Sequence, residues 1–202
     1  MPAEIWTIGQ EAHHEINIER SRFIGHAAFA ATEAEVKAYI GKIRQEYADA
    51  THNCYAYRIG AGESPLTYYN DHGEPTGTAG KPILNAILQA NLTQTVVVVT
   101  RYFGGKKLGV RGLIDAYHRT AAEVLSIAGK QLWIEGSEWR IELPYGLWQN
   151  LQRQIAAAEG NILQTEYLEK IHCQVWIPLE FFSAFRDKLA EFPEIMLQEA
   201  TN

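Results

Sequence analysis

The sequence predicts an α+β protein made of two domains. The chain has 202 residues, which is long enough for one large domain or two small ones. Its last third shows the complete order strand, helix, strand, strand, helix, strand, which is typical of a ferredoxin-like domain. That last third also carries most of the negative charge. We therefore expect a boundary between residues 132 and 136, with domains at 1–134 and 135–202.

The first domain is expected to begin with two strands and a helix. Apolar and polar residues alternate over 16–19, and 22–29 is a mostly apolar run, so both segments are predicted as strands. Thr32 and Glu35 have the spacing of a capping box, and apolar residues recur at helical spacing from 36 to 47. A helix should therefore begin at Thr32.

Two short strands and a second helix are expected next. The strands are predicted at 54–59 and 66–69, on either side of a stretch rich in turn residues, 60–65. The polar segment 70–80 is predicted as a loop. Pro82 suits the first turn of a helix. The amides of that turn have no partner within the helix, so the missing amide hydrogen of proline costs nothing there.

The first domain should end with a buried strand and a long helix. Four consecutive valines lie within 95–100, which indicates a strand buried on both faces. A glycine-rich loop follows. Apolar residues at helical spacing then extend from Leu113 to Ala128, and Gly129 is a suitable residue to cap the end of that helix.

The second domain contains four predicted strands and two predicted helices. The first strand, 137–143, alternates Trp, Ile and Leu with charged residues, as expected for a strand with one buried face. The remaining elements are a helix at 147–155, strands at 162–167 and 171–177, a helix after Pro178, and a last strand at 195–198.

Composition excludes several classes of protein. Hydrophobic residues make up 47% and charged residues 21%, which is ordinary for a globular protein. No apolar stretch is long enough to span a membrane, and the first six residues do not resemble a secretory signal. Cys54 and Cys173 lie far apart, so we expect no disulfide framework and no zinc site. The expectation is a cytoplasmic protein without metal or cofactor.

The charge is distributed unevenly along the chain. Residues 1–130 contain 13 basic and 13 acidic side chains, whereas residues 131–202 contain 5 basic and 11 acidic ones. Within the first part, 81–119 holds six basic side chains and a single acidic one, Asp115. An acidic protein can therefore still present a basic surface to an anionic partner.

The glycine-rich loop is the strongest candidate for a binding site. It has four glycines between Gly104 and Gly112 and leads from the valine strand into a helix, a geometry that suits phosphate. Val110 and Arg111 stand where a P-loop needs Lys and Ser or Thr, and the dinucleotide spacing of glycines is absent. Lys106, Lys107 and Arg111 favour an anion site. The alternative is that the glycines only permit tight turns.

A second loop, 71–82, also brings glycines and Lys81 to the start of a helix. If both helices begin at the same end of the sheet, the two loops flank one site. Asp71, His72 and Glu74 could act there as general acids and bases or as metal ligands, although no metal-ligand spacing supports the latter. The alternative is a turn that caps the helix through Thr78.

The strand at 52–58 is a third candidate. Tyr55 and Tyr57 would share one face, where exposed rings could stack on bases, with His52 or Arg58 near phosphate. Buried tyrosines are the commoner case. His52 and Cys54 would lie on the same face, but no residue nearby would orient the histidine, so a cysteine hydrolase is disfavoured.

Four stretches together resemble the IMPACT/YigZ family: 21–24, 50–58, 71–84 and 98–109. The resemblance implies a first domain similar to domain IV of elongation factor G and to a ribosomal-protein domain, with a left-handed βαβ crossover. It also implies a ferredoxin-like second domain. Family members are associated with translational regulation or suspected of binding nucleic acid or ribosomes, and no enzymatic reaction is implied. The sequence departs from the family pattern at Val110, Arg111 and Asp115, and Arg111 could pair with Asp115.

These observations favour a non-enzymatic, translation-associated factor that binds RNA or the ribosome through its two loops. The alternatives are an enzyme or sensor for a small phosphate or nucleotide ligand, and a protein-binding module. The predicted nucleic-acid or anion contacts are His52, Tyr55, Arg58, Gly77, Thr78, Gly80, Lys81, Arg101, Gly104, Gly105, Lys106, Lys107, Gly109 and Arg111.

Overall fold

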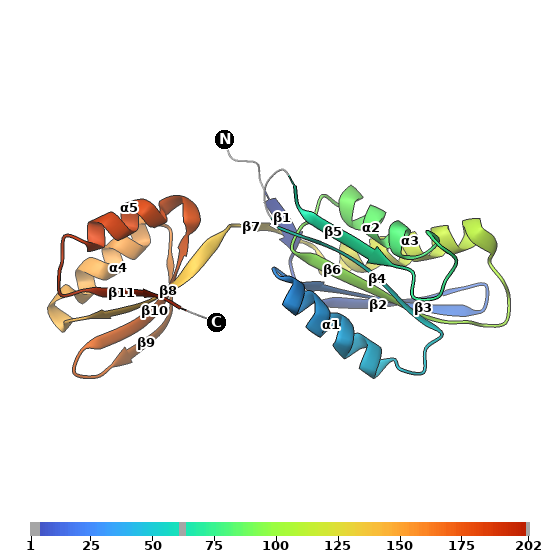
Figure 1. Ribbon diagram of the computed structural model, residues 1–202, viewed down its shortest axis with the longest axis horizontal. Coiled ribbons are helices and arrows are strands. Elements are labelled where there is room, and N and C mark those ends of the chain that lie inside the picture. Colours follow the sequence, from blue (N-terminus) through green and yellow to red (C-terminus); the bar gives the residue numbers. More distant parts are fainter. Residues whose placement is uncertain (1–4, 61–63, 201–202) are drawn as a thin grey trace. The chain divides into compact units, whose positions relative to one another are not determined.

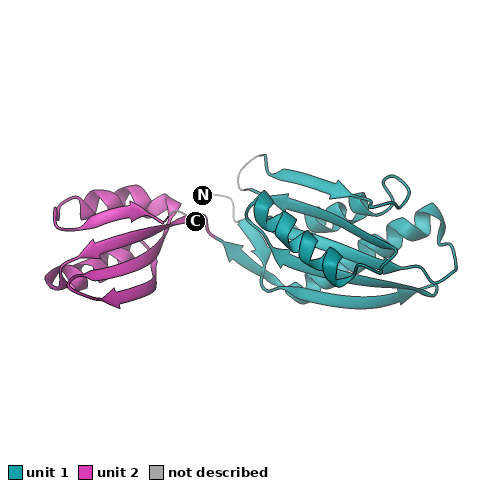
Figure 2. Cartoon of the chain, turned by 60° about the horizontal axis from the view of Figure 1, so that its bottom comes forward, with its two compact units in different colours: residues 1–133 teal, residues 134–202 magenta. Residues whose placement is uncertain are grey.

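The computed structural model describes residues 5–60 and 64–200 (Figure 1). The chain divides into two compact units, Met1–Trp133 and Ile134–Asn202 (Figure 2). Two sequence expectations fall partly outside the described residues: the absence of a secretory signal at residues 1–4 and the turn-rich stretch at 61–63. Each unit is described here by itself.

The first unit is built on a five-stranded sheet with the order β2-β3-β6-β4-β5. Every neighbouring pair in it is antiparallel. Because β3 and β4 both run antiparallel to β6, they are parallel to each other, and helix α1 connects them. The strands are β2 (Ala12–Ile18), β3 (Ser21–Phe29), β6 (Thr95–Tyr102), β4 (His52–Ile59) and β5 (Leu66–Asn70).

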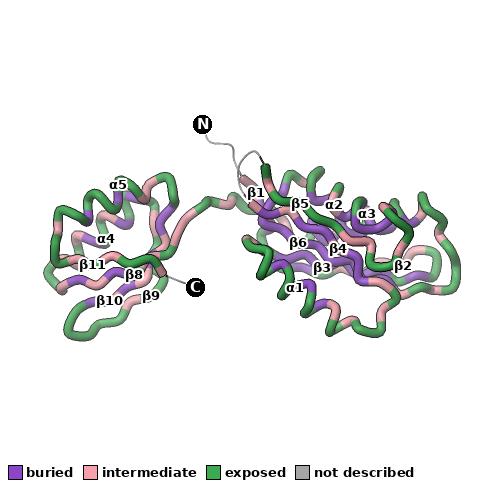
Figure 3. Tube along the Cα trace, in the orientation of Figure 1, coloured by how far each residue is buried: buried purple, intermediate pink, exposed green. Residues whose placement is uncertain are grey.

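Helices cover both faces of this sheet (Figure 1). Helix α1 (Glu33–Glu46) packs on one face with Val96 and Val98. Helices α2 (Gly80–Gln89) and α3 (Gly109–Ala128) pack on the other face with the alternate valines of β6. Every residue of β6 from Thr95 to Arg101 is buried (Figure 3), which confirms the strand predicted from the valine run.

The predicted ends of two helices are also confirmed. The hydroxyl of Thr32 accepts the amide of Glu35 at 3.2 Å, and the Glu35 carboxylate accepts the amide of Ala31 at 2.6 Å. This is a capping arrangement in which the carboxylate reaches one residue further back than in the usual capping box. Gly129 follows α3 with φ of +68°, a conformation that glycine adopts without strain, and its amide donates to the carbonyl of Leu125.

Two strands of the first unit were not predicted from the sequence. Strands β1 (Ile5–Ile8) and β7 (Lys130–Trp133) form a separate antiparallel pair. Each has only four residues, which is too short for a clear alternation of apolar and polar side chains. The boundary between the domains was predicted in this region, between residues 132 and 136, and no strand was expected there.

The second unit has a four-stranded antiparallel sheet with the order β11-β8-β10-β9. The predicted order of strands and helices is confirmed. Its core lies between the sheet and the two helices, with the rings of Trp139 and Phe182 stacked 4.1 Å apart. The elements are β8 (Gly136–Leu143), α4 (Trp148–Ala157), β9 (Asn161–Tyr167), β10 (Ile171–Pro178), α5 (Leu179–Leu189) and β11 (Met196–Glu199).

Candidate nucleic-acid interface

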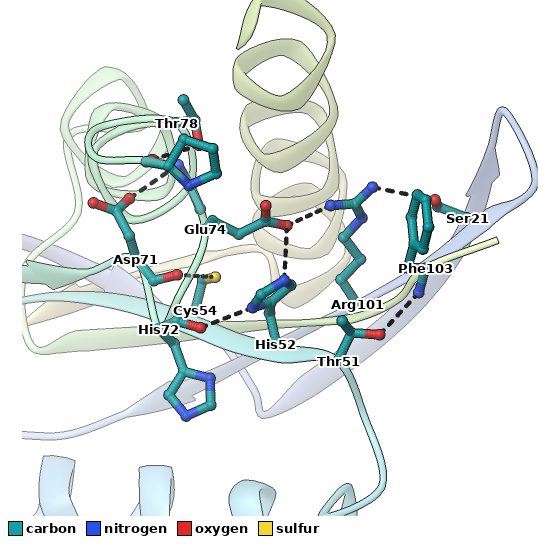
Figure 4. A network of polar contacts seen from close by, with 12 residues as sticks. Ser21, Thr51, His52, Cys54, Asp71, His72, Glu74, Thr78, Arg101 and Phe103 are labelled. Carbon is teal, nitrogen blue, oxygen red and sulfur yellow. Dashed lines mark hydrogen bonds and ion pairs between the residues drawn. The ribbon is translucent and has the colours of Figure 1, made fainter. Parts of the chain in front are cut away.

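The loop before α2 folds around the carboxylate of Asp71. Its two oxygens accept the amides of Gly77 at 2.9 Å, Ala79 at 3.1 Å and Gly80 at 2.8 Å (Figure 4). A carboxylate at the start of a helix satisfies free amides and interacts favourably with the helix dipole. The amides of Gly77 and Gly80, which the sequence suggested for phosphate, are therefore occupied within the chain.

The cap of α2 comes from Asp71 and not from Thr78. The Thr78 hydroxyl is buried and donates to the carbonyl of Pro75 at 2.7 Å. Gly80 has a packing role, because a Cβ there would lie 2.7 Å from the backbone nitrogen of Asn70 at the end of β5. This loop is thus held by contacts within the chain at each of these three positions.

A buried ion pair joins this loop to the end of β6. The Oε1 atom of Glu74 lies 2.5 Å from Nη1 of Arg101, and these two side chains are 4% and 6% exposed (Figure 4). Tyr117 on α3 donates its hydroxyl hydrogen to the same oxygen at 2.8 Å, and Nε2 of His52 lies 3.8 Å away. Arg101, predicted as a phosphate contact, is instead enclosed between the rings of Phe23 and Phe103.

His52 and Cys54 belong to the same network but do not form a nucleophilic pair. Nδ1 of His52 donates to the carbonyl of His72 at 2.8 Å, and the Cys54 thiol donates to the carbonyl of Asp71 at 2.9 Å. Burial raises the pKa of the Cys54 thiol to about 12, so the thiolate needed for attack is scarce at neutral pH. Burial also raises the pKa of Tyr117.

The other two residues predicted on β4 lie elsewhere. Arg58 donates from Nη1 to the carbonyl of Leu92 at 3.2 Å. The register pairs Arg58 with Thr95 and His52 with Arg101, so these two β4 residues are about 20 Å apart along the strand. Tyr55 is half-buried and packs against the core on the α1 face. His52, Tyr55 and Arg58 therefore do not form one site.

The loop between β6 and α3 packs against the chain at Gly104, whereas a Cβ at Gly105 or Gly109 would meet no neighbour. A Cβ on Gly104 would overlap the carbonyl oxygen of Arg20, so only glycine allows this close approach to the β2–β3 turn. The amide of Gly104 also donates to the Ser21 hydroxyl at 3.3 Å. Gly105 and Gly109 have φ of +85° and +71°, and a Cβ there would meet no neighbour, so these glycines serve the turn itself.

Exposed cations lie on the second half of this loop and on the first turns of α2 and α3. Lys81, Lys106, Lys107 and Arg111 are all exposed. Lys106 pairs with Glu19 at 2.5 Å, whereas Lys81, Lys107 and Arg111 have no ion-pair partner within the described residues. The possible pairing of Arg111 with Asp115 is not among the ion pairs of the described chain.

We call Lys106, Lys107 and Arg111, with the exposed Phe103 and Val110 beside them, the α3 entry surface. Phe103 is 46% and Val110 62% exposed. No side chain of the described residues caps the first turn of α3. Next to this surface, a groove of about 400 Å³ is lined by Glu19, Asp115 and Arg119 together with both lysines. The surface thus combines two cations without an ion-pair partner in the described residues, Lys107 and Arg111, with an exposed aromatic ring and the amides of the helix start.

Comparison with known proteins places this arrangement in a family. The model of the Impact N-terminal domain matches residues 19–125, which contain both loops and the buried ion pair. The chain belongs to the IMPACT family. A second model, a domain of unknown function named DUF1949, matches residues 141–192 of the second unit.

Bacterial IMPACT proteins resemble the chain over most of its length. The IMPACT family member YvyE of Bacillus subtilis is 35% identical over 189 residues, covering 92% of this chain and 85% of YvyE. YigZ of Escherichia coli is 31% identical and covers 90% and 89%. A crystal structure of a hypothetical protein has a TM-score of 0.70 and 28% identity, and the match covers 100% of this chain and 99% of that one.

Sequence reasoning about this IMPACT chain missed Tyr117 and Phe103 as parts of the region. Tyr117 lies in the apolar stripe of α3 and was counted as core, although its hydroxyl binds Glu74. In residues 5–60 and 64–200, no group of three or more acidic, histidine or cysteine side chains is arranged to hold a metal ion. None of the helices described is long and apolar enough to cross a membrane.

Proposed function

We propose that this IMPACT-family chain is a translation-associated factor that binds RNA, free or within the ribosome, through the α3 entry surface. The observation that carries the proposal is the pair of exposed cations Lys107 and Arg111, which flank the uncapped start of a 20-residue helix. Free cations beside helix amides suit phosphate groups, which dominate affinity for nucleic acids.

The charges around the surface support the same conclusion. Asp71 accepts backbone amides, and Glu74 and Arg101 form a buried ion pair, so these charges do not reach an external ligand. The positive charge available to one comes from Lys81, Lys107, Arg111 and the exposed Lys106. The exposed ring of Phe103 adds a flat apolar surface of the kind that stacks on unpaired bases. The family resemblance implies the same class of partner.

The test is RNA and ribosome binding across a salt series. The K106Q/K107Q/R111Q variant should bind short single-stranded RNA more weakly, and the slope of log affinity against log salt should become shallower by about 2, from three lost contacts at about 0.7 each. The control K170Q/R186Q/K188Q removes three exposed charges from the second unit and should bind like the wild type. Equal binding by the charge-removed variant would overturn the proposal.

A small phosphate-bearing ligand is the second candidate, because the groove of about 400 Å³ beside Lys106 and Lys107 is large enough for one. In that case nucleotides should raise the unfolding temperature in a saturable way, and the RNA salt series should show no binding. The general acid–base role suggested for Asp71 and Glu74 loses support, since both carboxylates are engaged inside the chain.

A further inference from the structure

Three tyrosines form a stacked cluster on the α1 face of the first unit, away from the α3 entry surface. The Tyr68 ring of β5 lies 5.7 Å from the Tyr57 ring and 6.1 Å from the Tyr55 ring, with interplanar angles of 26° and 29°. Tyr57 is 8% exposed, whereas Tyr68 is 47% exposed. We call Tyr55, Tyr57 and Tyr68, with the neighbouring Arg44, the tyrosine platform.

The strand register explains why these rings meet. Tyr68 lies directly opposite Tyr57 in the antiparallel pair of β4 and β5, and side chains directly opposite one another are close enough to touch. Strand β5 is at the edge of the sheet, and α1 packs mainly on β4 and β6. The outer side of the Tyr68 ring is therefore exposed. Its inner side stacks on the rings of Tyr55 and Tyr57, which are more buried.

Positive and hydrogen-bonding groups lie beside the platform. The Arg44 guanidinium sits 5.3 Å from the centre of the Tyr55 ring, has no ion pair within the described residues, and its buried Nε has no partner. Nδ1 of His72 accepts the amide of Asn53 at 3.1 Å, so the neutral ring carries its hydrogen on Nε2. Figure 4 shows the His72 ring pointing away from Glu74 and toward α1.

We infer that the tyrosine platform stacks unpaired RNA bases, with Arg44 beside it for a phosphate. The inference rests on the proposed function and adds to it a second contact area, specific for single strands. An exposed ring on rigid aromatic neighbours accepts the face of any base, and a guanidinium with no ion pair in the described chain suits a backbone phosphate. Bases within a duplex are stacked on one another and cannot reach such a ring.

The test compares two tyrosines of the same strand. Tyr69 is 41% exposed and lies opposite Ala56, so it projects from the other face of the sheet and is a matched control for Tyr68. Y68A should weaken binding of a 20-nucleotide single strand by about tenfold, with an unchanged salt slope and unchanged binding of the duplex of the same sequence. Y69A and Y68F should bind the single strand within about twofold of the wild type.

The outcomes separate this inference from the proposed function. Equal affinity of Y68A and the wild type for the single strand, or an equal loss in Y69A, would overturn the platform and leave the α3 entry surface standing. A loss in Y68A together with full binding by K106Q/K107Q/R111Q would support the platform and overturn the α3 entry surface. A wild-type protein that binds neither RNA would overturn both.

Discussion

The carboxylate of Glu74 lies 2.5 Å from the guanidinium of Arg101, and neither side chain is more than 6% exposed. The pair connects the loop before α2 to the end of β6, and Tyr117 adds α3 to the same oxygen. Breaking one partner of a buried ion pair leaves the other charged and without water. The loop before α2, the end of β6 and α3 are therefore tied together through this one carboxylate, and its removal should be costly.

E74A should lower the free energy of unfolding by about 3 to 5 kcal/mol, because it leaves Arg101 unpaired in the interior. Urea unfolding followed by circular dichroism would measure this loss. E19A removes the exposed partner of Lys106 and should leave the urea midpoint close to that of the wild type. Similar midpoints for E74A and E19A would contradict the structural role of the buried pair.

D71A should destabilise the start of α2. The substitution removes the acceptor of three amide hydrogens, and losing a helix cap costs about 1 to 2 kcal/mol. Hydrogen exchange should accelerate at the amides of Gly77, Ala79 and Gly80, while the amides of β6 stay protected. D115A, an exposed carboxylate on α3, serves as the control; slow exchange at Gly80 in D71A would argue against the cap.

Stability should fall as the pH drops from about 6.5 to 4, in part because of His26. Burial lowers the pKa of His26 from 6.5 to about 4, with smaller opposing effects of Glu46 and Glu11 and like-charge effects of His13 and Lys42. Across that pH window the unfolded chain binds a proton that the folded chain does not, so the free energy of unfolding declines by roughly 3 kcal/mol. Above about pH 6.5 this contribution is constant.

Urea unfolding of H26Q and the wild type at several pH values would check this. The free energy of unfolding of the wild type minus that of H26Q should decrease by roughly 3 kcal/mol between pH 7 and pH 4. H118Q changes a half-buried histidine on α3, whose Nε2 lies 2.9 Å from Oε1 of Gln89, and serves as the control for removing a histidine elsewhere. A parallel pH profile for H26Q and the wild type would rule out the buried neutral histidine.

Two glycine substitutions should act in opposite directions. G104A places a methyl group against the carbonyl oxygen of Arg20, so the loop must move and the protein should lose about 1 to 3 kcal/mol. G41A lies within α1, where a Cβ meets no neighbour, and should gain up to about 1 kcal/mol because alanine favours the helix. Thermal unfolding of both variants beside the wild type would measure this, and a stabilised G104A would contradict the close approach.

The sequence predicted those parts of the fold that local patterns determine. The four valines of β6, the capping residues Thr32 and Glu35 and the strand order of the second unit all follow from spacing within a short window. Strands β1 and β7 could not be found this way, because each has four residues and their pairing joins segments more than 120 positions apart. Their existence depends on a long-range contact.

The candidate site was predicted less well, for a related reason. A charged residue in a glycine-rich loop suggests an external anion, and the sequence contains nothing to show that Arg101 meets Glu74 or that Gly77 and Gly80 donate to Asp71. Arg101 and Glu74 lie 27 residues apart in the sequence, so their contact becomes visible only in the folded chain. Lys107 and Arg111, which have no ion-pair partner in the described chain, remain where the sequence suggested.

The pairing of β1 with β7 also bears on how the protein is made. Ile5 lies opposite Trp133, so β1 cannot form this pair until the last residues of the first unit have been synthesised. Until then the backbone groups of β1 lack this partner, whereas all strands of the five-stranded sheet lie earlier in the chain, between Ala12 and Tyr102. A nascent chain that ends before residue 130 should therefore leave β1 without its partner strand and open to proteases and chaperones.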